Sequence, residues 1–445
     1  MTPSDTHVPE ADPVVIVGMA VEAPGGVDSA EGYWTLLAEQ RDALGPFPED
    51  RGWSLRELFD GSRRDGFTPI RNLGGFLDSA GTFDAEFFGI SPREALAMDP
   101  QQRVALRLAW RACEDSGINP DDLAGHDVGC YVGASTLEYG PPLSQFSHHS
   151  GHLITGTALG VISGRIAYTL DLAGPALTVD TSCSSALAAL HTAVAALRAG
   201  DCDLALAGGV CVMGSPGYFV EFSRQHALSE DGHCRPYSAH ASGTVWAEGA
   251  GMFLLQRRSR ARADGRRILA EVLASCLNSD GRSAGLTAPR EQAQTRLFTR
   301  ALRSAGLRPG EVGMIEGHGT GTRLGDRTEL RSLAATYGAG TAGEGPWLGS
   351  VKSNVGHAQA AAGALGLAKV LLAAERANIP PTLHVDDPSH EIAWRETGLR
   401  LARKMTPWPA EGGRRVGAVS AFGMSGTNTH LVVSVPDGHT AGAGR

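Results

Sequence analysis

Cys183 stands in a turn that suits a nucleophile. The apolar segment ALTVD leads into TSCSS, and a helix rich in small residues is predicted to begin at or just after the cysteine. At such a position the free N–H groups and the positive end of the helix dipole lower the pKa of a thiol, so we expect a thiolate at neutral pH. The remaining cysteines lack such a turn and are predicted to be small buried hydrophobic residues: Cys113, Cys130, Cys202, Cys211, Cys234 and Cys276.

Two histidines occupy similar glycine-rich turns after predicted strands. His318 lies in MIEGHGTGTRLGD, and His357 lies in LGSVKSNVGHAQAAAG. The small neighbours leave an imidazole accessible and let a ligand approach the backbone. A lone histidine is more often structural. Two histidines in matched turns, together with a candidate thiolate, form the set that nucleophilic catalysis with positioned proton donors needs.

A glycine-rich loop separates two predicted strands in VSAFGMSGTNTHL. The loop consists of Gly423, Met424, Ser425 and Gly426. Such a loop can direct a backbone N–H at a developing oxyanion, and with the amide of Cys183 it could form an oxyanion hole for a thioester intermediate. The residues alone favour the plainer alternative, an ordinary hairpin turn.

Alternating strands and helices must position these turns. Continuous apolar runs predict buried strands at PVVIVGMAV, DVGCYVGA and CDLALAGGVCVM, and helical spacing of apolar residues predicts helices at EGYWTLLAEQ and DPQQRVALRLAWRACEDSG. The strand, turn and helix order of ALTVDTSCSSALAALHTAVAALRAG recurs in PWLGSVKSNVGHAQAAAGALGLAKVLLAAE. The pattern predicts an α/β fold built from two related halves, with both turns at their junction.

We expect one folded body between two flexible ends. Residues 1–11 and 437–445 are polar and carry proline or glycine, which is typical of disordered termini. The N-terminal half is expected to take residues 12–258 and to carry the nucleophilic cysteine. The C-terminal half is expected to take residues 259–436 and to carry the two histidines.

Charge and composition narrow the classes of function. A net charge of −9 argues against nucleic-acid binding, which relies on basic surfaces. The 7 cysteines show neither a disulfide framework nor metal-ligand spacing, so we expect a reducing cytoplasm and no metal. The N-terminus lacks the features of a signal peptide, and no apolar run is long enough to span a bilayer. We therefore expect a cytoplasmic protein that binds neither membrane nor nucleic acid.

Four segments resemble the signature segments of ketosynthase domains of modular type I polyketide synthases: VDTSCSSAL, EGHGTGTRLGD, KSNVGH and FGMSGTNTH. Further similarity covers nearly all of residues 12–436. The resemblance implies a thiolase-like fold, with two duplicated halves in a layered αβαβα arrangement, usually as a homodimer. It also implies an acyltransferase that binds no separate cofactor, because its substrates are carried on the phosphopantetheine of an acyl carrier protein.

The resemblance assigns roles to the three reactive residues. Cys183 would accept an acyl chain from the carrier protein. His318 and His357 would bind the thioester carbonyl of a malonyl-type extender during decarboxylation, because two neutral imidazole donors stabilise an enolate oxygen without quenching the carbanion.

Supporting residues follow from the same resemblance. Lys352 matches a lysine that pairs with an acidic residue, here expected to be Glu329. Asn428 and the loop Gly423–Gly426 match the gate of the site, and the backbone N–H of Met424 is expected to complete the oxyanion hole. Four residues depart from those usual in the family without removing a catalytic residue: Ala186, Gly317, Arg327 and Thr328.

Polyketide ketosynthase activity by decarboxylative condensation is the leading hypothesis. The alternative is a ketosynthase that cyclises or off-loads a carrier-bound chain by forming an aldol, a lactone or a β-lactone. A catalytically silent partner subunit is less favoured because Cys183 is present. No acyltransferase, reductase or carrier segment follows the last predicted strand, so we expect a free-standing enzyme with its carrier protein in trans. Apolar surface near LALAGGVCVM is expected to be covered by a second copy of the chain.

Overall fold

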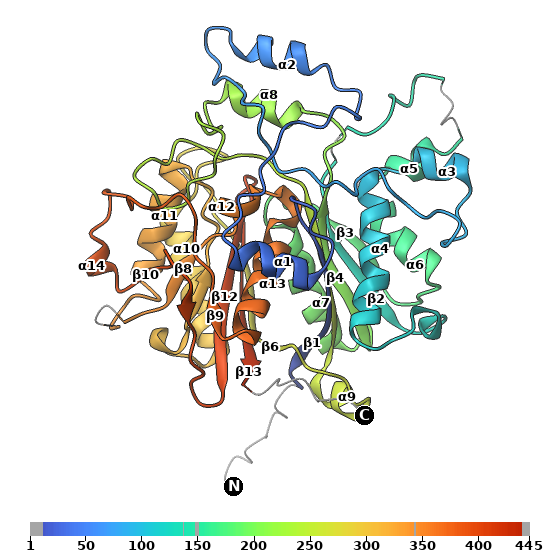
Figure 1. Ribbon diagram of the computed structural model, residues 1–445. Helices are drawn as coiled ribbons and strands as arrows, with labels where there is room; N and C mark the ends of the chain where they lie inside the picture. The colour runs from blue at the N-terminus through green and yellow to red at the C-terminus, as the bar shows by residue number, and fades with distance from the viewer. Residues whose placement is uncertain (1–11, 137, 147–150, 342–343, 438–445) are drawn as a thin grey trace.

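One mixed, hydrogen-bonded β-sheet extends through both halves of the molecule (Figure 1). The computed structural model describes residues 12–136, 138–146, 151–341 and 344–437, and in that part of the chain the main sheet has eleven strands. From one edge to the other the strands are β10 (Arg400–Leu401), β8 (Trp347–Gly349), β7 (Met314–Glu316), β12 (Arg414–Phe422), β13 (Thr427–Pro436), β6 (Ala270–Ser279), β1 (Val14–Glu22), β5 (Gly249–Arg257), β4 (Leu204–Cys211), β2 (Val128–Gly133) and β3 (Ala176–Val179). A separate pair is formed by β9 (Asn378–Ile379) and β11 (Thr406–Pro407).

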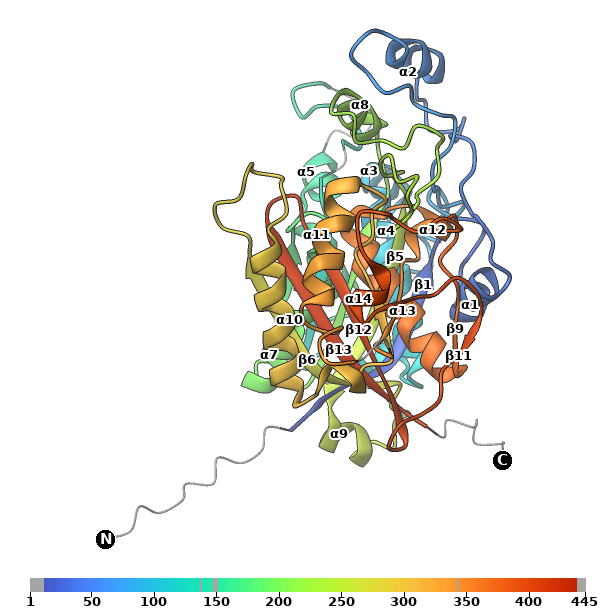
Figure 2. The ribbon, with the colours of Figure 1, turned by 90° about the vertical axis from the view of Figure 1, so that its left-hand side faces the viewer.

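Helices pack against the sheet, and short helices also lie within the loops beyond the ends of the strands (Figures 1 and 2). The α-helices are α1 (Ala30–Ala38), α2 (Leu55–Ser62), α3 (Pro92–Ala97), α4 (Pro100–Asp115), α5 (Leu153–Thr157), α6 (Val161–Thr169), α7 (Ser185–Ala199), α8 (Gly217–Arg224), α9 (Arg258–Ala263), α10 (Glu291–Ala305), α11 (Arg323–Ala334), α12 (Lys352–Val355), α13 (Ala362–Glu375) and α14 (Trp394–Thr397). Three 3-10 helices complete the set: η1 (Pro120–Leu123), η2 (Pro309–Glu311) and η3 (Gln359–Ala361).

The strand order occurs twice. Along the sheet, the N-terminal half has the strand order β3, β2, β4, β5 and β1. The C-terminal half has β8, β7, β12, β13 and β6 in the corresponding places. In both halves the first two of these pairings are parallel and the last two antiparallel. The halves meet where β1 pairs with β6 through Val15 and Ile16. The predicted duplication is confirmed.

Two helices lie between the halves. The helix α7 contacts β2 and β4 of its own half and β6 and β13 of the other, while α13 contacts β7 and β12 of its own half and β4 and β5 of the other. Residues of α13 are buried almost throughout, as a helix that is apolar on all sides requires. The helices α4 and α6 cover the outer face of the first half, and α10, backed by α11, covers that of the second. The layers are therefore αβαβα, which confirms the predicted fold class.

Local sequence explains where the elements begin and end. All residues of β1 are buried, as its unbroken apolar run predicts. The helix α4 starts with Pro100, and the side chain of Asp99 accepts a hydrogen bond from the backbone N–H of Gln101 at 2.8 Å. A proline in the first turn and an aspartate cap are both typical helix-start signals. The predicted strands and helices around residues 14, 30, 100, 128 and 204 are all present.

One ground for a dimer proves wrong. The segment near LALAGGVCVM was expected to leave apolar surface exposed, but β4 is buried along its whole length by strands and helices of the same chain. An exposed apolar side chain lies instead on β3, one of the two edge strands of the sheet, where Leu177 is 48% exposed. Among the described residues no helix is long and apolar enough to cross a membrane. The predicted flexible ends lie outside the described residues, except for Asp437.

Candidate active site

Cys183, His318 and His357 line one cavity of about 150 Å³. The cysteine follows β3 in the N-terminal half, and the histidines follow β7 and β8 in the C-terminal half. The centroids of the two imidazole rings lie 5.3 Å apart, and the rings are nearly perpendicular at 85°. The structure thus brings together the three residues whose turns suggested chemistry, at the junction of the two halves.

The turn that carries the cysteine is strained and tightly bonded. Ser182 has a φ of 58°, in the left-handed region that few residues other than glycine adopt. Its N–H donates to Asp180 Oδ1 at 2.8 Å, and the N–H of Thr181 donates to Ser185 Oγ at 2.9 Å. These bonds hold the strained residue in place. They present Cys183 to the cavity two residues before α7 begins.

Burial raises the pKa of the Cys183 thiol to about 11, because the thiolate loses its hydration. The positive charge of Lys352 and the backbone N–H groups of Met424 and Cys183 act in the opposite direction but do not offset the burial. The expectation of a lowered pKa at this position is therefore wrong. A turn beside a helix start predicts favourable dipoles, but it does not reveal that the side chain is enclosed.

The glycine loop between β12 and β13 packs against the nucleophile turn. A Cβ on Gly423 would stand 2.1 Å from the carbonyl oxygen of Thr181, so the backbones can approach this closely only at a glycine. Ser425 Oγ donates to the same carbonyl at 3.4 Å. Gly423, Met424 and Gly426 line the cavity, and the N–H of Met424 favours the charged form of Cys183. The loop can therefore offer a backbone donor to an oxyanion beside the sulfur.

His318 is fixed through its backbone and through one ring nitrogen. Its N–H and that of Gly319 donate to the two carboxylate oxygens of Glu329 at 2.7 and 2.8 Å. The N–H of Phe422 donates to His318 Nδ1 at 3.4 Å. Because Nδ1 accepts, the proton of the neutral ring stands on Nε2.

His357 has the same tautomer. The backbone N–H of Gln359 donates to its Nδ1 at 3.1 Å, so its proton also stands on Nε2. Among the described residues, that Nε2 is buried without a hydrogen-bond partner. The segment around Trp246 pairs with His357 through backbone bonds on both sides, and its indole lies 5.1 Å from the imidazole. The ring is thus held from its backbone while one donor remains available to a ligand.

Both imidazoles are neutral at physiological pH. Burial and the positive charge of Lys352 hold the pKa of His318 and the pKa of His357 well below the ordinary value of 6.5. Neutral rings that each carry a proton on Nε2 are hydrogen-bond donors without a full positive charge. They suit an oxygen that develops negative charge, since a cationic acid would transfer its proton to the product carbanion.

Lys352 is buried and interacts with acidic side chains through its charge. Burial lowers the pKa of Lys352, while the negative charge of Glu316 and, more weakly, that of Glu329 act to raise it. Glu316 is paired with Lys369 Nζ at 2.7 Å, and in the described part of the chain no ion pair within 4.0 Å joins Lys352 to Glu329. The predicted pairing of Lys352 with Glu329 thus consists of the interaction of their charges. The carboxylate of Glu329 instead accepts from the His318 turn and from the hydroxyl of Tyr237 at 3.0 Å.

Asn428 lies outside the cavity lining. It is fully buried in β13, and its side-chain amide donates to Asp280 Oδ1 at 2.8 Å. Asp280 lines the cavity, so Asn428 positions a residue that sequence reasoning did not assign. Other lining residues were also missed, and no spacing pattern marks them: Phe222, Thr244, Trp246, Leu286, Thr287, Pro289 and Phe422.

Comparisons with known proteins agree with this geometry. The family profile "Beta-ketoacyl synthase, N-terminal domain" matches residues 11–261, and "Beta-ketoacyl synthase, C-terminal domain" matches residues 269–386. The chain is 52% identical over 426 residues to the pikromycin polyketide synthase component PikAII of Streptomyces venezuelae, covering 95% of this chain and 11% of that protein. It is 50% identical over 425 residues to the mycoketide-CoA synthase of Mycobacterium tuberculosis, covering 95% of this chain and 10% of the relative.

Solved structures show the same fold. The oxazolomycin ketosynthase domain OzmH KS7 of Streptomyces albus superposes with a TM-score of 0.90 at 36% identity, over 96% of this chain and 76% of that one. The ketosynthase from module 6 of the bacillaene synthase of Bacillus subtilis gives a TM-score of 0.86 at 34% identity, over 96% and 73% of the two chains.

Proposed function

The chain belongs to the beta-ketoacyl synthase family, and from this premise we propose that its cavity condenses carrier-bound acyl units in polyketide biosynthesis. The enzyme is of the acyltransferase type. Its substrates are thioesters on the phosphopantetheine of an acyl carrier protein, as in the polyketide synthases that it resembles. The chain spans about a tenth of the curated relatives described above, so its substrates and partners are part of the proposal.

The observation that carries the proposal is the pair of neutral Nε2–H donors beside a buried thiol. His318 and His357 each accept a backbone hydrogen bond at Nδ1 and so present a proton at Nε2. Both rings line the cavity that contains Cys183. Two convergent uncharged donors are what an enolate oxygen requires, whereas hydrolysis or simple acyl transfer needs only one oxyanion site.

Acyl loading uses the cysteine. The Cys183 sulfur attacks the carrier thioester, the carbonyl oxygen becomes an oxyanion facing the amides of Cys183 and Met424, and the phosphopantetheine thiol departs with the proton that the cysteine gives up. Because the pKa of the thiol is about 11, most of it is protonated at pH 7, and deprotonation must accompany attack.

Condensation uses the histidines. The malonyl carboxylate leaves as CO₂, and the electron pair of the broken C–C bond forms an enolate whose oxygen accepts from Nε2 of His318 and Nε2 of His357. The enolate carbon attacks the acyl–Cys183 thioester and forms the new C–C bond. Collapse of the tetrahedral oxyanion expels the Cys183 thiolate, which takes a proton from water, and leaves a β-ketoacyl chain on the carrier.

Release of labelled CO₂ tests the reaction. The protein, loaded on Cys183 from an acyl pantetheine thioester, should release one ¹⁴CO₂ from [¹⁴C-carboxyl]malonyl carrier protein for each β-ketoacyl product. His191, which lies outside the cavity and bonds Ser275 Oγ at 2.9 Å, gives a matched control histidine, and His191→Gln should retain the activity. A cyclised product without CO₂ would show that the site closes rings or off-loads chains.

A homodimer and a two-part organisation complete the proposal. The free edge of β3 carries Leu177, and α6 beside it exposes 86% of Tyr168, so this edge offers an apolar surface to a second copy. The halves divide after residue 258, between β5 and β6, where the repeated strand order begins again. Fragments 12–258 and 259–436 should form a complex when they are co-expressed, and failure of both to associate would argue against that boundary.

A further inference from the structure

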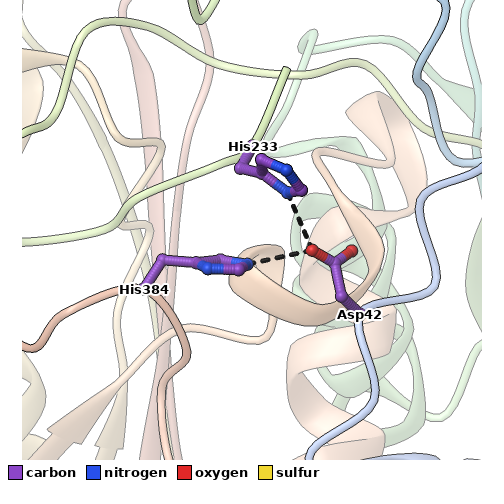
Figure 3. Close-up of side chains that lie close together, drawn as sticks. All are labelled: Asp42, His233 and His384. Atoms are coloured by element: carbon purple, nitrogen blue, oxygen red, sulfur yellow. Dashed lines mark hydrogen bonds and ion pairs between the residues drawn. The ribbon is translucent and has the colours of Figure 1, made fainter. Parts of the chain in front are cut away.

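Three side chains distant in the sequence converge outside the catalytic cavity. Asp42 follows α1, His233 lies in the loop after α8, and His384 follows β9. One carboxylate oxygen of Asp42 contacts both rings, with His233 Nδ1 at 2.8 Å and His384 Nε2 at 2.9 Å (Figure 3). The ring centroids lie 4.9 Å apart. A carboxylate and two imidazoles thus point at one small volume.

Each of the three loops is bonded to a turn that holds a catalytic histidine. The neighbours of Asp42 bond Asn354, which accepts from the N–H of Ala43 at 2.7 Å and donates from its side chain to the carbonyl of Arg41 at 3.1 Å. Asn354 belongs to α12, immediately before the His357 turn. The loop that contains Asp42 is therefore fixed to the segment that leads into His357.

The two histidine loops have equivalent attachments. The N–H of Leu383, next to His384, donates to Ser353 Oγ in α12 at 2.9 Å. The thiol of Cys234, next to His233, donates to the carbonyl of Thr320 in the His318 turn at 3.2 Å. Each of the three converging residues is therefore next in sequence to a residue that forms a hydrogen bond with α12 or with the His318 turn.

The backbone of His384 is held in a costly conformation. Its φ is 60°, in the left-handed region that few residues other than glycine adopt, although histidine is found there more often than most. Such conformations persist only where surrounding bonds enforce them, and they are concentrated at ligand-binding and catalytic positions. Here the strained residue is the one that directs its imidazole to Asp42.

We propose that Asp42, His233 and His384 form a binding site for a divalent transition-metal ion of the zinc type, which ties together the loops that hold the catalytic histidines. Two imidazole nitrogens and one carboxylate oxygen are a donor set that suits Zn²⁺, with a fourth position left for water. The donor atoms all lie within 4.8 Å of one another. Tetrahedral zinc with bonds of about 2.1 Å separates its ligands by roughly 3.4 Å, so the two O···N contacts need to open by only about half an ångström.

The solvent exposure of the three side chains and the chemistry of the two imidazoles are compatible with a bound metal ion. The side chains of Asp42, His233 and His384 are 24%, 32% and 23% exposed, so an ion can enter from solvent. An imidazole can offer the lone pair of the nitrogen that faces Asp42 to an ion when its proton stands on the other ring nitrogen. The spacing of the cysteines predicts no metal, but this site uses no cysteine.

The chain contains a matched control for a plain hydrogen-bonded cluster. Asp387 also has two histidine partners, His390 Nε2 at 2.7 Å and His240 Nε2 at 3.4 Å. These rings are 76% and 70% exposed, and the trio does not meet the donor spacing of the first set. If Asp42, His233 and His384 bind the ion, loss of a histidine from this trio should weaken zinc binding, whereas loss of a histidine from the Asp387 trio should not.

The test is zinc binding by the full chain. Protein stripped with a chelator and dialysed against zinc should bind one Zn²⁺ per chain, measured by plasma mass spectrometry. His233→Gln and His384→Gln should each weaken the affinity by at least about a hundredfold, more than the loss of an outer-shell partner costs. His390→Gln and Cys183→Ala should both keep the wild-type stoichiometry, and the latter excludes zinc bound by the catalytic thiol.

A second measurement does not depend on the variants folding. Co²⁺ added to the stripped wild-type protein should give visible d–d bands of a four- or five-coordinate nitrogen and oxygen site, without thiolate charge transfer in the near ultraviolet. Zinc should also slow amide hydrogen exchange in the peptide that spans α12. Equal zinc in all four variants, a thiolate band with Co²⁺, or no zinc above the level of a protein without the cluster would overturn the proposal and leave a hydrogen-bonded cross-link. Condensation activity is not used as a readout, so these outcomes stand apart from the proposed function.

Discussion

The hydroxyl of Tyr237 occupies the space in which a Cβ at position 317 would stand. A methyl group built on Gly317 meets that oxygen at 1.9 Å. The same hydroxyl donates to Glu329 Oε2 at 3.0 Å, and Glu329 in turn accepts from the backbone of His318. The glycine that departs from the family pattern therefore makes room for a tyrosine that supports the turn of His318.

Gly317→Ala should destabilise the fold and displace this turn. Overpacking against a buried hydroxyl is expected to cost about 1–3 kcal/mol in urea unfolding. Tyr237→Phe removes the oxygen, so in that background the cost of Gly317→Ala should fall by about 1 kcal/mol or more. Equal costs in both backgrounds would show that the clash is relieved elsewhere. Decarboxylation by the wild type, the two single variants and the double variant reports whether the His318 turn moves.

Alkylation of Cys183 should follow a high pKa. Because burial raises the pKa of the thiol to about 11, the thiolate fraction and the iodoacetamide rate should rise about tenfold per pH unit from pH 7 to about pH 10. Intact-protein mass spectrometry measures the rate, and Cys183→Ala supplies the background from the other cysteines. A plateau below pH 9 would mean that the folded protein stabilises the thiolate. Cys183→Ala should also abolish acyl loading while leaving the fold intact.

Replacement of either catalytic-site histidine should separate loading from condensation. His318→Ala and His357→Ala each remove one Nε2–H donor, so CO₂ release and product formation should fall by about a hundredfold or more. Loading of Cys183, followed by mass shift, should remain largely intact because its oxyanion donors are backbone amides. Severe loss of loading in both variants would instead assign a general base for Cys183 to the histidines.

The free energy of unfolding should fall as the pH is lowered, because His430 is buried in its neutral form. Burial between Tyr337 and Ser420 lowers the pKa of His430 to about 3, whereas the unfolded ring titrates near 6.5. Between these values the unfolded chain binds a proton that the folded chain does not, so the free energy of unfolding falls as pH drops below 6.5, by about 1.4 kcal/mol per pH unit for this group.

Urea unfolding between pH 6.5 and 4.5 measures that slope. His430→Gln should reduce the slope by about 1.4 kcal/mol per pH unit, which corresponds to one proton, whatever the effect of the substitution on stability at pH 7. His390→Gln, at a position whose side chain is 76% exposed, serves as the control and should leave the slope unchanged. The same slope in wild type and His430→Gln would show that His430 becomes protonated without unfolding.

Association through the free edge of β3 should depend on Leu177. A charge at that position opposes both strand pairing and apolar contact, so Leu177→Asp should convert a dimer into monomers at micromolar concentration. Leu324 on α11 is 49% exposed, nearly the same as Leu177, and Leu324→Asp should leave the mass unchanged in light scattering. A wild-type monomer would refute the proposed dimer directly.

Features encoded by neighbouring residues were predictable. The strand, turn and helix around Cys183 are read from an apolar run, small polar residues and a helical pattern, all within one short stretch. The turn before α13, which holds His357, follows the same rule. Because both stretches share one order, the duplication and the meeting of the reactive residues could also be inferred.

Features that depend on distant contacts were not predictable. The enclosure of Cys183, which reverses the expected direction of its pKa shift, is produced by residues from both halves. Asp42 meets His233 and His384 across 191 and 342 positions, and no spacing rule links them. An apolar run also cannot tell a central strand from an edge strand, so β4 was mistaken for a source of exposed surface.

The repeated strand order places Cys183 and His357 after corresponding strands, β3 and β8, of two copies of one structural unit. One copy thus carries the proposed covalent acceptor, and the other carries the proposed imidazole donors. Residues of both copies line the shared cavity, so neither copy alone determines which chain is accepted. A change in either copy therefore alters one common site, and the two copies are expected to evolve as a single unit.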